Sequence, residues 1–182
     1  MALNTVSRSL HDIGLSAWFG GTLANAVALN PAASAAGNAA DAGAVVNAGW
    51  DRWTPINAAA IGAHVIGSIG QLQGNSERLG KQQGVASMAL VKTGLTAAAL
   101  GATAYSRVLG RKVSEQTHVP VVSGTEPAAS TPPEVAAAQR QLRLLQWAIP
   151  ALTGAVVIVS AFAGEQQRAS EAHKGLAKRL VG

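Results

Sequence analysis

Four long segments of the chain carry almost no charge. Residues 13–40, 53–76 and 144–164 contain no charged side chain, and residues 85–106 contain one, Lys92. A helix needs about 20 predominantly apolar residues to cross the roughly 30 Å hydrocarbon core of a bilayer, so each segment is long enough to span it. The pattern therefore predicts an integral membrane protein.

The composition of these segments refines that prediction. Charged residues make up 13% of the 182 residues, about half the roughly 25% typical of soluble domains. Because Ala and Gly supply much of the apolar character, each segment is a marginal candidate for insertion, except residues 144–164, which include Val156–Val159. A soluble, Ala-rich helical bundle is the alternative. Small residues favour a tightly packed membrane bundle, in which helices associate through close backbone approach.

We expect an all-α fold, a bundle of four transmembrane helices that forms a single domain over residues 1–182. The fourth helix is extended, because its pattern can stay helical from about residue 134 to 163. The predicted parts are spans at about residues 10–29, 54–74, 85–109 and 144–164, a Pro-rich extramembrane loop at 110–143 and a solvated tail at 165–182.

Local signals set the predicted helix ends. Asn30-Pro31 is predicted to end the first helix, because proline disfavours the helical conformation in the residue before it. Composition leaves residues 32–49 undecided between a short helix and an interfacial segment, whereas polar residues 75–84 predict a tight connection. Thr131-Pro-Pro-Glu134 predicts the start of the fourth helix with Thr131 as its N-cap, and Pro150 is expected to kink that helix.

Four spans place both chain ends on one side of the membrane. We name this side face A and the opposite side, with the loops near residues 40 and 120, face B. Trp50, Trp53 and Trp147 fall at face B, where indoles favour the headgroup level. Lys and Arg divide seven to six between faces A and B, so the predicted location is a multi-pass cell-membrane protein with cytoplasmic termini.

Lys92 is the charged exception inside a predicted span. An ionisable group at that depth is costly and usually faces a bundle interior, a cavity or a partner. Its long side chain can also reach the headgroups at face A. Asp12 is the nearest expected counter-ion, since the first and third spans both begin at face A.

The first span carries a polar stripe that is expected to point into the bundle. His11, Leu15, Trp18, Thr22 and Asn25 share one face at helical spacing. Thr22 and Asn25 are expected to form interhelical hydrogen bonds, which contribute modestly to stability in lipid.

His64 lies near the middle of the second span, on a face with Ala60 and Ser68. Two interpretations stay open: a buried neutral histidine bonded to another helix, or a metal or haem ligand. Helix rise places His64 about 18 Å from the face A end of its helix, while His11 begins near the surface. Two ligands of one ion lie within a few ångströms, so the two histidines are not expected to share a metal.

Small residues recur at four-residue spacing in two helices. The rows are Ala59, Ala63 and Gly67 in the second span, and Thr93, Ala97 and Gly101 in the third. They predict packing surfaces, either inside the bundle or against another subunit.

Catalytic motifs are missing from the sequence. It holds no phosphate loop, no zinc-type histidine pairing and no intramembrane carboxylate pair, and the absence of cysteine excludes thiolate chemistry. The candidate residues are therefore Lys92, His64 and Asn25 for binding a small molecule or cofactor, His11 and His64 for a metal, and Asp12, Trp18, Thr22, Gly67 and Pro150 for structure.

The run His11-Asp-Ile-Gly-Leu-Ser-Ala-Trp18-Phe-Gly20-Gly21 resembles the opening helix of the copper-resistance D (CopD)-like membrane proteins, which begins with a histidine followed by a Trp-x-Gly-Gly turn. The resemblance covers 11 of 182 residues and implies that His11 is a metal-associated or structural histidine. A copper path would be expected to contain further methionines and histidines, whereas Met88 is the only methionine after Met1. The composition is also similar to that of small four-helix membrane proteins of GC-rich bacteria.

Two functions follow as expectations. The first is a non-enzymatic accessory, assembly or scaffold protein of an envelope complex, with a protein partner or a second copy bound through the small-residue faces. The alternative is a carrier or binding protein for a small molecule, lipid, metal or haem, in which Lys92, His64 and Asn25, with His11 and Asp12, form the site. Nucleic acid is not an expected partner, because no basic run with interleaved aromatics occurs.

Overall fold

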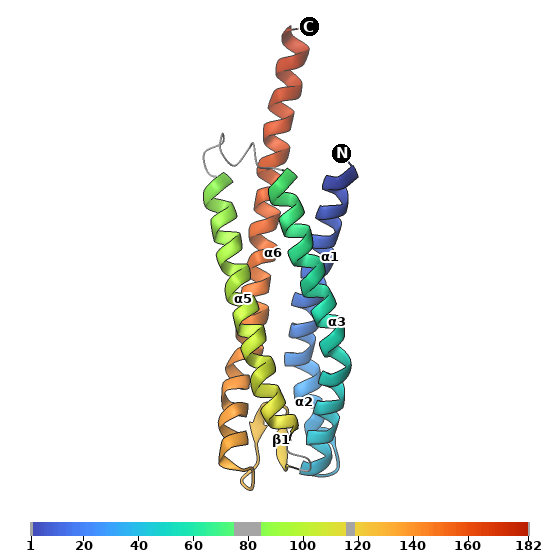
Figure 1. Ribbon diagram of the computed structural model, residues 1–182, viewed down its shortest axis with the longest axis vertical. Helices are drawn as coiled ribbons and strands as arrows, with labels where there is room; N and C mark the ends of the chain where they lie inside the picture. Colours follow the sequence, from blue (N-terminus) through green and yellow to red (C-terminus); the bar gives the residue numbers. More distant parts are fainter. Residues whose placement is uncertain (1, 75–84, 116–118, 182) are drawn as a thin grey trace.

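The computed structural model describes residues 2–74, 85–115 and 119–181. Long helices run side by side, alternately up and down, and a small hairpin closes one end (Figure 1). The long helices are α1 (Ala2–Ala24), α3 (Ala39–Gly74), α5 (Val85–Ser114) and α6 (Pro133–Val181). The predicted all-α class is confirmed, and the two ends of the chain lie at the same end of the bundle, face A. The predicted connection at 75–84 lies outside the described residues.

The first helical path does not end at Asn30-Pro31, so that prediction was wrong. After α1 the backbone forms a π-helical turn, η1 (Asn25–Leu29), then α2 (Asn30–Ala32) and a 3₁₀ turn, η2 (Ala33–Ala35). Pro31 is the second residue of α2, and proline is tolerated in the first turn of a helical segment. The wider π turn, closed by a bond from the Asn30 amide to the Asn25 carbonyl, lets the helical path continue through the proline.

The second helix is longer than predicted at its start. α3 is described as far as Gly74, and it begins at Ala39 instead of near residue 54. Asn38 explains this start, because its Oδ1 accepts hydrogen bonds from the amides of Ala40 at 3.1 Å and Asp41 at 2.9 Å. Capping of this kind satisfies amides that the first helical turn leaves unpaired.

The predicted Pro-rich loop contains a hairpin. Strand β1 (Val121–Ser123) pairs antiparallel with β2 (Glu126–Pro127) at face B. The hairpin rests on a cluster of buried side chains from three elements, namely Ala33, Ala42, Val46 and Val121.

α6 begins at Pro133, as the sequence predicted, and continues with Pro150 inside it to Val181. The predicted role of Thr131 as N-cap was wrong, because its hydroxyl is used to fasten the loop. It donates to the Pro120 carbonyl at 2.6 Å and accepts from the Ala128 amide at 2.8 Å. Buried Thr153 donates to the Ile149 carbonyl at 2.9 Å and so satisfies its own hydroxyl beside Pro150.

The helices pack as two pairs. α1 packs along α3, α5 packs along α6, and α1 contacts α6, whereas α3 and α5 barely touch in the described chain. α1 and α3 approach closely at glycines: a Cβ at Gly67 would lie 2.5 Å from the Ser7 carbonyl oxygen and closer still to the His11 nitrogen. Gly67 therefore packs as predicted, but Ala59 of the same row and the whole row Thr93, Ala97 and Gly101 are exposed.

Many polar side chains are buried in the bundle, and many large apolar side chains are exposed on its surface. The buried polar side chains include His11, Thr22, Asn25, Asn30, Asn57, His64, Gln139 and Thr153, while large apolar side chains exposed on all four helices include Ile13, Val27, Ile56, Ile66, Leu90, Val108, Leu144, Ile158 and Phe162. Among the described residues, Pro133–Glu165 is the one helix that is both long and apolar enough to cross a membrane, and 22% of its most apolar window is buried. α1, α3 and α5 owe their weaker apolar character to Ala and Gly.

The close α1–α3 crossing gives a first prediction. Gly67→Ala should lower the stability of the purified protein by about 1–3 kcal/mol, because the added methyl group overpacks two backbones. Gly62→Ala on the same helix is the control, since its Cβ would meet nothing within 4 Å; it should be neutral or stabilising. Thermal unfolding in mild detergent measures both, and equal melting temperatures for the two variants would contradict the crossing.

Candidate functional site

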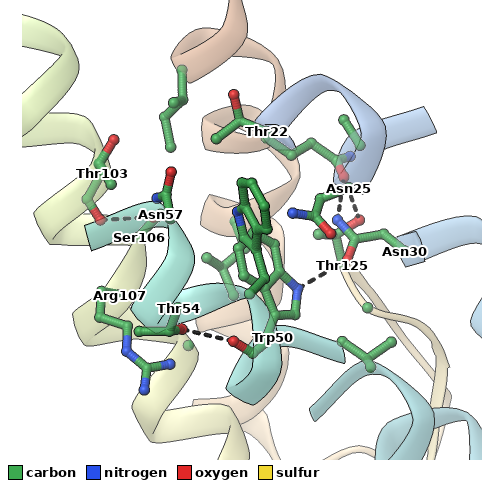
Figure 2. Close-up of a pocket in the computed structure, with 18 of the residues that line it drawn as sticks. Thr22, Asn25, Asn30, Trp50, Thr54, Asn57, Thr103, Ser106, Arg107 and Thr125 are labelled. Atoms are coloured by element: carbon green, nitrogen blue, oxygen red, sulfur yellow. Dashed lines mark hydrogen bonds between the residues drawn. The ribbon is translucent and has the colours of Figure 1, made fainter. Parts of the chain in front are cut away.

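A cavity of about 300 Å³ separates α3 from α5 in the face B half of the bundle (Figure 2). Its wall is predominantly apolar, with Ile61, Leu100 and Ile149 among its lining residues. The α1–η1–α2 path, α3, α5, α6 and the hairpin all contribute to it. The lining residues of α3 and α5 face each other across it, because these two helices barely touch in the described chain.

Two residues that line the cavity each hold a buried polar atom that lacks a partner among the described residues. These atoms are Oδ1 of Asn57, which is 8% exposed, and Nε1 of the half-buried Trp53. One is an acceptor and the other a donor. An unpaired buried group of this kind costs about 1–3 kcal/mol, so the pair is a reason to look for a ligand in the cavity.

The wall nearest face B is a hydrogen-bonded network centred on Asn30. The Trp50 indole donates to Asn30 Oδ1 at 3.2 Å, and Asn30 Nδ2 donates to Gln146 Oε1 at 2.9 Å (Figure 2). The Gly124 amide donates to the Asn30 carbonyl at 3.3 Å, and Thr125 Oγ1 donates to Gln146 Oε1 at 3.4 Å. One asparagine thus joins α2, α3, α6 and the hairpin.

Asn30 was missed by the sequence analysis, which treated it as a helix end. The signal that could have found it is a polar amide inside an uncharged segment, next to a proline. Trp50 was assigned only to the headgroup level, whereas its indole packs against the hairpin cluster and bonds inward.

The predicted stripe of the first helix is confirmed as buried. His11, Leu15, Trp18, Thr22 and Asn25 are each at most 8% exposed. Thr22 and Asn25 line the cavity, but Thr22 donates to the Trp18 carbonyl of its own helix at 2.8 Å instead of to another helix. The link between helices comes from Trp18, whose Nε1 donates to Thr103 Oγ1 on α5 at 3.3 Å.

His11 and His64 lie outside the cavity lining and meet each other between α1 and α3. Their ring centroids are 4.6 Å apart, so the depth argument that separated them was wrong. α1 begins at Ala2, about two turns before His11, which places His11 as deep as His64. His11 Nδ1 lies 2.7 Å from Asp12 Oδ1, and His64 Nδ1 lies 3.5 Å from the His11 carbonyl oxygen.

Lys92 belongs to this second cluster. It is half-buried, and it interacts electrostatically with Asp12, His11 and His64. Asp12, the predicted counter-ion, thus acts on both His11 and Lys92. The structure brings four of the predicted site residues together here and places Asn25 elsewhere, in the cavity.

The cluster is a poor fit for a metal or haem. No group of three or more His, Cys, Asp or Glu side chains is arranged for a metal within the described residues, and Lys92 and Arg8 add positive charge near His11. A haem held between two imidazoles places each nitrogen about 2 Å from the iron and the ring centres roughly 6 Å apart. The observed 4.6 Å separation leaves no room for one.

Comparisons with known proteins add no family: no family model, curated protein or solved structure matches the chain. The resemblance of the His11–Gly21 run to CopD-like proteins therefore stays a prediction.

The Asn30 network gives a second prediction. Asn30→Ala should destabilise the protein by at least about 2 kcal/mol, because Trp50 Nε1 and Gln146 Oε1 lose the Asn30 side chain as a partner. Gln146 also bonds Thr125 of the hairpin, so the hairpin should loosen even though Gly124 keeps its bond to the backbone carbonyl of residue 30. Ser34→Ala removes an exposed hydroxyl bonded only within its own turn and should change stability little. Amide hydrogen exchange at residues 121–127 should become faster in Asn30→Ala and stay unchanged in Ser34→Ala. Equal protection of these amides in the two variants would contradict the role given to Asn30.

Proposed function

We propose that this chain is a multi-pass membrane protein that binds a small amphipathic molecule in the cavity between α3 and α5. The observation that carries the proposal is a predominantly apolar 300 Å³ cavity whose lining residues include two, Asn57 and Trp53, with an unpartnered buried polar atom, Oδ1 and Nε1. A polar group of an amphipathic ligand could pair with one of them, since the indole donates and the amide oxygen accepts.

The outward-facing side chains support a bilayer around all four helices. Ile13 is 70% exposed on α1, Ile66 63% on α3, Leu90 74% on α5 and Ile158 59% on α6. Exposed apolar surface on this scale is unusual for a soluble monomer and is favourable in lipid. The buried histidines, amides and hydroxyls belong inside such a bundle, where they face protein groups instead of hydrocarbon.

The size and position of the cavity suggest the kind of ligand. Small-molecule sites usually measure about 300–1,000 Å³ and combine apolar walls with a few polar groups. This cavity is at the lower end of that range, and we place its opening between α3 and α5, which barely touch, facing the proposed bilayer. A lipid-soluble molecule can then enter sideways, without crossing water.

Ala58 and Ala59 provide a matched test, because both are exposed on α3 and Ala58 alone lines the cavity. The probe is 8-bromooctan-1-ol, whose bromine quenches tryptophan fluorescence, added to protein in phosphatidylcholine nanodiscs. A Trp147→Phe background removes the exposed indole of α6. Ala59→Phe should show saturable quenching. In Ala58→Phe the affinity for the alcohol should fall at least about tenfold, because the added ring fills the cavity.

Lys92→Ala separates the two candidate sites in the same assay. It should leave the quenching curve unchanged, because Lys92 does not line the cavity. Quenching that is linear and unsaturable in every variant would exclude the cavity as a binding site. Loss of saturable quenching in Lys92→Ala would instead indicate that the ligand binds at the histidine cluster.

A second proposal, an accessory or scaffold role through a partner helix or a second copy, is favoured by one observation. Thr93, Ala97 and Gly101 form an exposed row on α5, and a Cβ at Gly94 or Gly101 would meet nothing within 4 Å. Rows of small residues let two helices approach closely in lipid. Ala97→Phe should then reduce the mass of the detergent-solubilised assembly in light scattering, and an unchanged monomeric mass in both proteins would remove this proposal.

A further inference from the structure

Arg107 is a charged residue on the cavity wall for which the described chain provides no ion-pair partner. It lies on α5, one turn beyond Thr103, and it is half-buried. Thr54 of α3 also lines the cavity, and both side chains are drawn in Figure 2. The described arginines Arg143 and Arg52 do have partners, Glu126 Oε1 at 3.9 Å and the Ala48 carbonyl at 3.2 Å.

Resting on the proposed function, we infer that the cavity selects an amphipathic carboxylic acid, whose carboxylate binds Arg107 while its apolar chain occupies the space toward Ile61 and Leu100. A guanidinium presents its N–H donors in a planar fork that matches the two oxygens of a carboxylate. In a half-buried site this charge-assisted pair is worth more than in water, because less solvent screens it. Arg107 thus supplies the charge complement, and the apolar wall supplies the chain site.

The charged residues that line the cavity favour a ligand with a single negative charge. Asp51 also lines the cavity, but it is exposed, so its carboxylate stays in solvent and repels an anionic ligand only weakly. A phosphate monoester carries about −1.5 to −2 charges at neutral pH, which Arg107 alone would not balance next to Asp51. A carboxylate matches one guanidinium.

The test compares two probes that differ only in the head group: 8-bromooctanoic acid and 8-bromooctan-1-ol. At pH 7.5 the acid is ionised, since carboxyl groups titrate near about 4 to 5. In Trp147→Phe nanodiscs the acid should bind at least about tenfold more tightly than the alcohol. Arg107→Gln should remove this preference, so that acid and alcohol bind the variant with equal affinity, and an unchanged melting temperature shows that the protein is still folded.

Three further variants sharpen the result. Arg107→Lys keeps the charge and should retain part of the preference, whereas Arg111→Gln, one turn further along and outside the lining, should retain all of it. Asp51→Asn should tighten binding of the acid and leave the alcohol unaffected. Octyl phosphate should displace bound 8-bromooctanoic acid less well than octanoate does.

The outcomes separate this inference from the function on which it rests. Saturable binding of acid and alcohol with equal affinity would overturn the inference and leave the proposed function standing. A preference for the acid that survives in Arg107→Gln would also overturn it, as would stronger competition by octyl phosphate. Failure of both probes to bind would remove the proposed function and the inference together.

Discussion

Small and polar residues make many of the contacts inside the bundle, because many large apolar side chains point outward while fewer, such as Trp18, Ile149 and Val156, are buried. Leu90 and Leu144 are each 74% exposed, while His64 and Gln139 are fully buried. Such a bundle gains little from hydrophobic burial between its helices, so it depends on close backbone approach and hydrogen bonds. The glycine crossing of α1 and α3 supplies the first, and the Asn30 network supplies the second. Both are suited to the bilayer that we propose around the bundle.

This constraint also explains why the cavity lies where it does. The glycines draw α3 toward α1, and α5 packs on α6, so the space between α3 and α5 stays open. The Asn30 network and the hairpin close this space at face B. Asn57, Trp53 and Arg107 then line a chamber in which the described chain does not satisfy their polar groups. Packing thus creates the space, and the lining chemistry determines which ligand can occupy it.

Sequence periodicity predicted the parts that depend on one helix alone. The buried stripe from His11 to Asn25 and the start of α6 at Pro133 follow from helical spacing and from the paired prolines before Glu134. The parts that depend on two or more elements were not predicted. The π turn before Pro31, the short hairpin and the meeting of His11 with His64 each require knowledge of how neighbouring helices are placed. Arg107 was counted as a surface charge, since nothing in its local sequence reveals a cavity.

Single-cysteine labelling tests the central claim, an apolar exterior buried in lipid on all four helices, most directly. The chain has no cysteine, so Ile13→Cys, Ile66→Cys, Leu90→Cys, Ile158→Cys and Ala129→Cys each give one reactive site in proteoliposomes. The account predicts that a water-soluble, membrane-impermeant maleimide labels Cys at position 129, in the exposed loop at face B, once that face is accessible, and leaves the other four unlabelled. Rapid labelling at positions 13, 66 and 90 would contradict it, since α1, α3 and α5 would then face water.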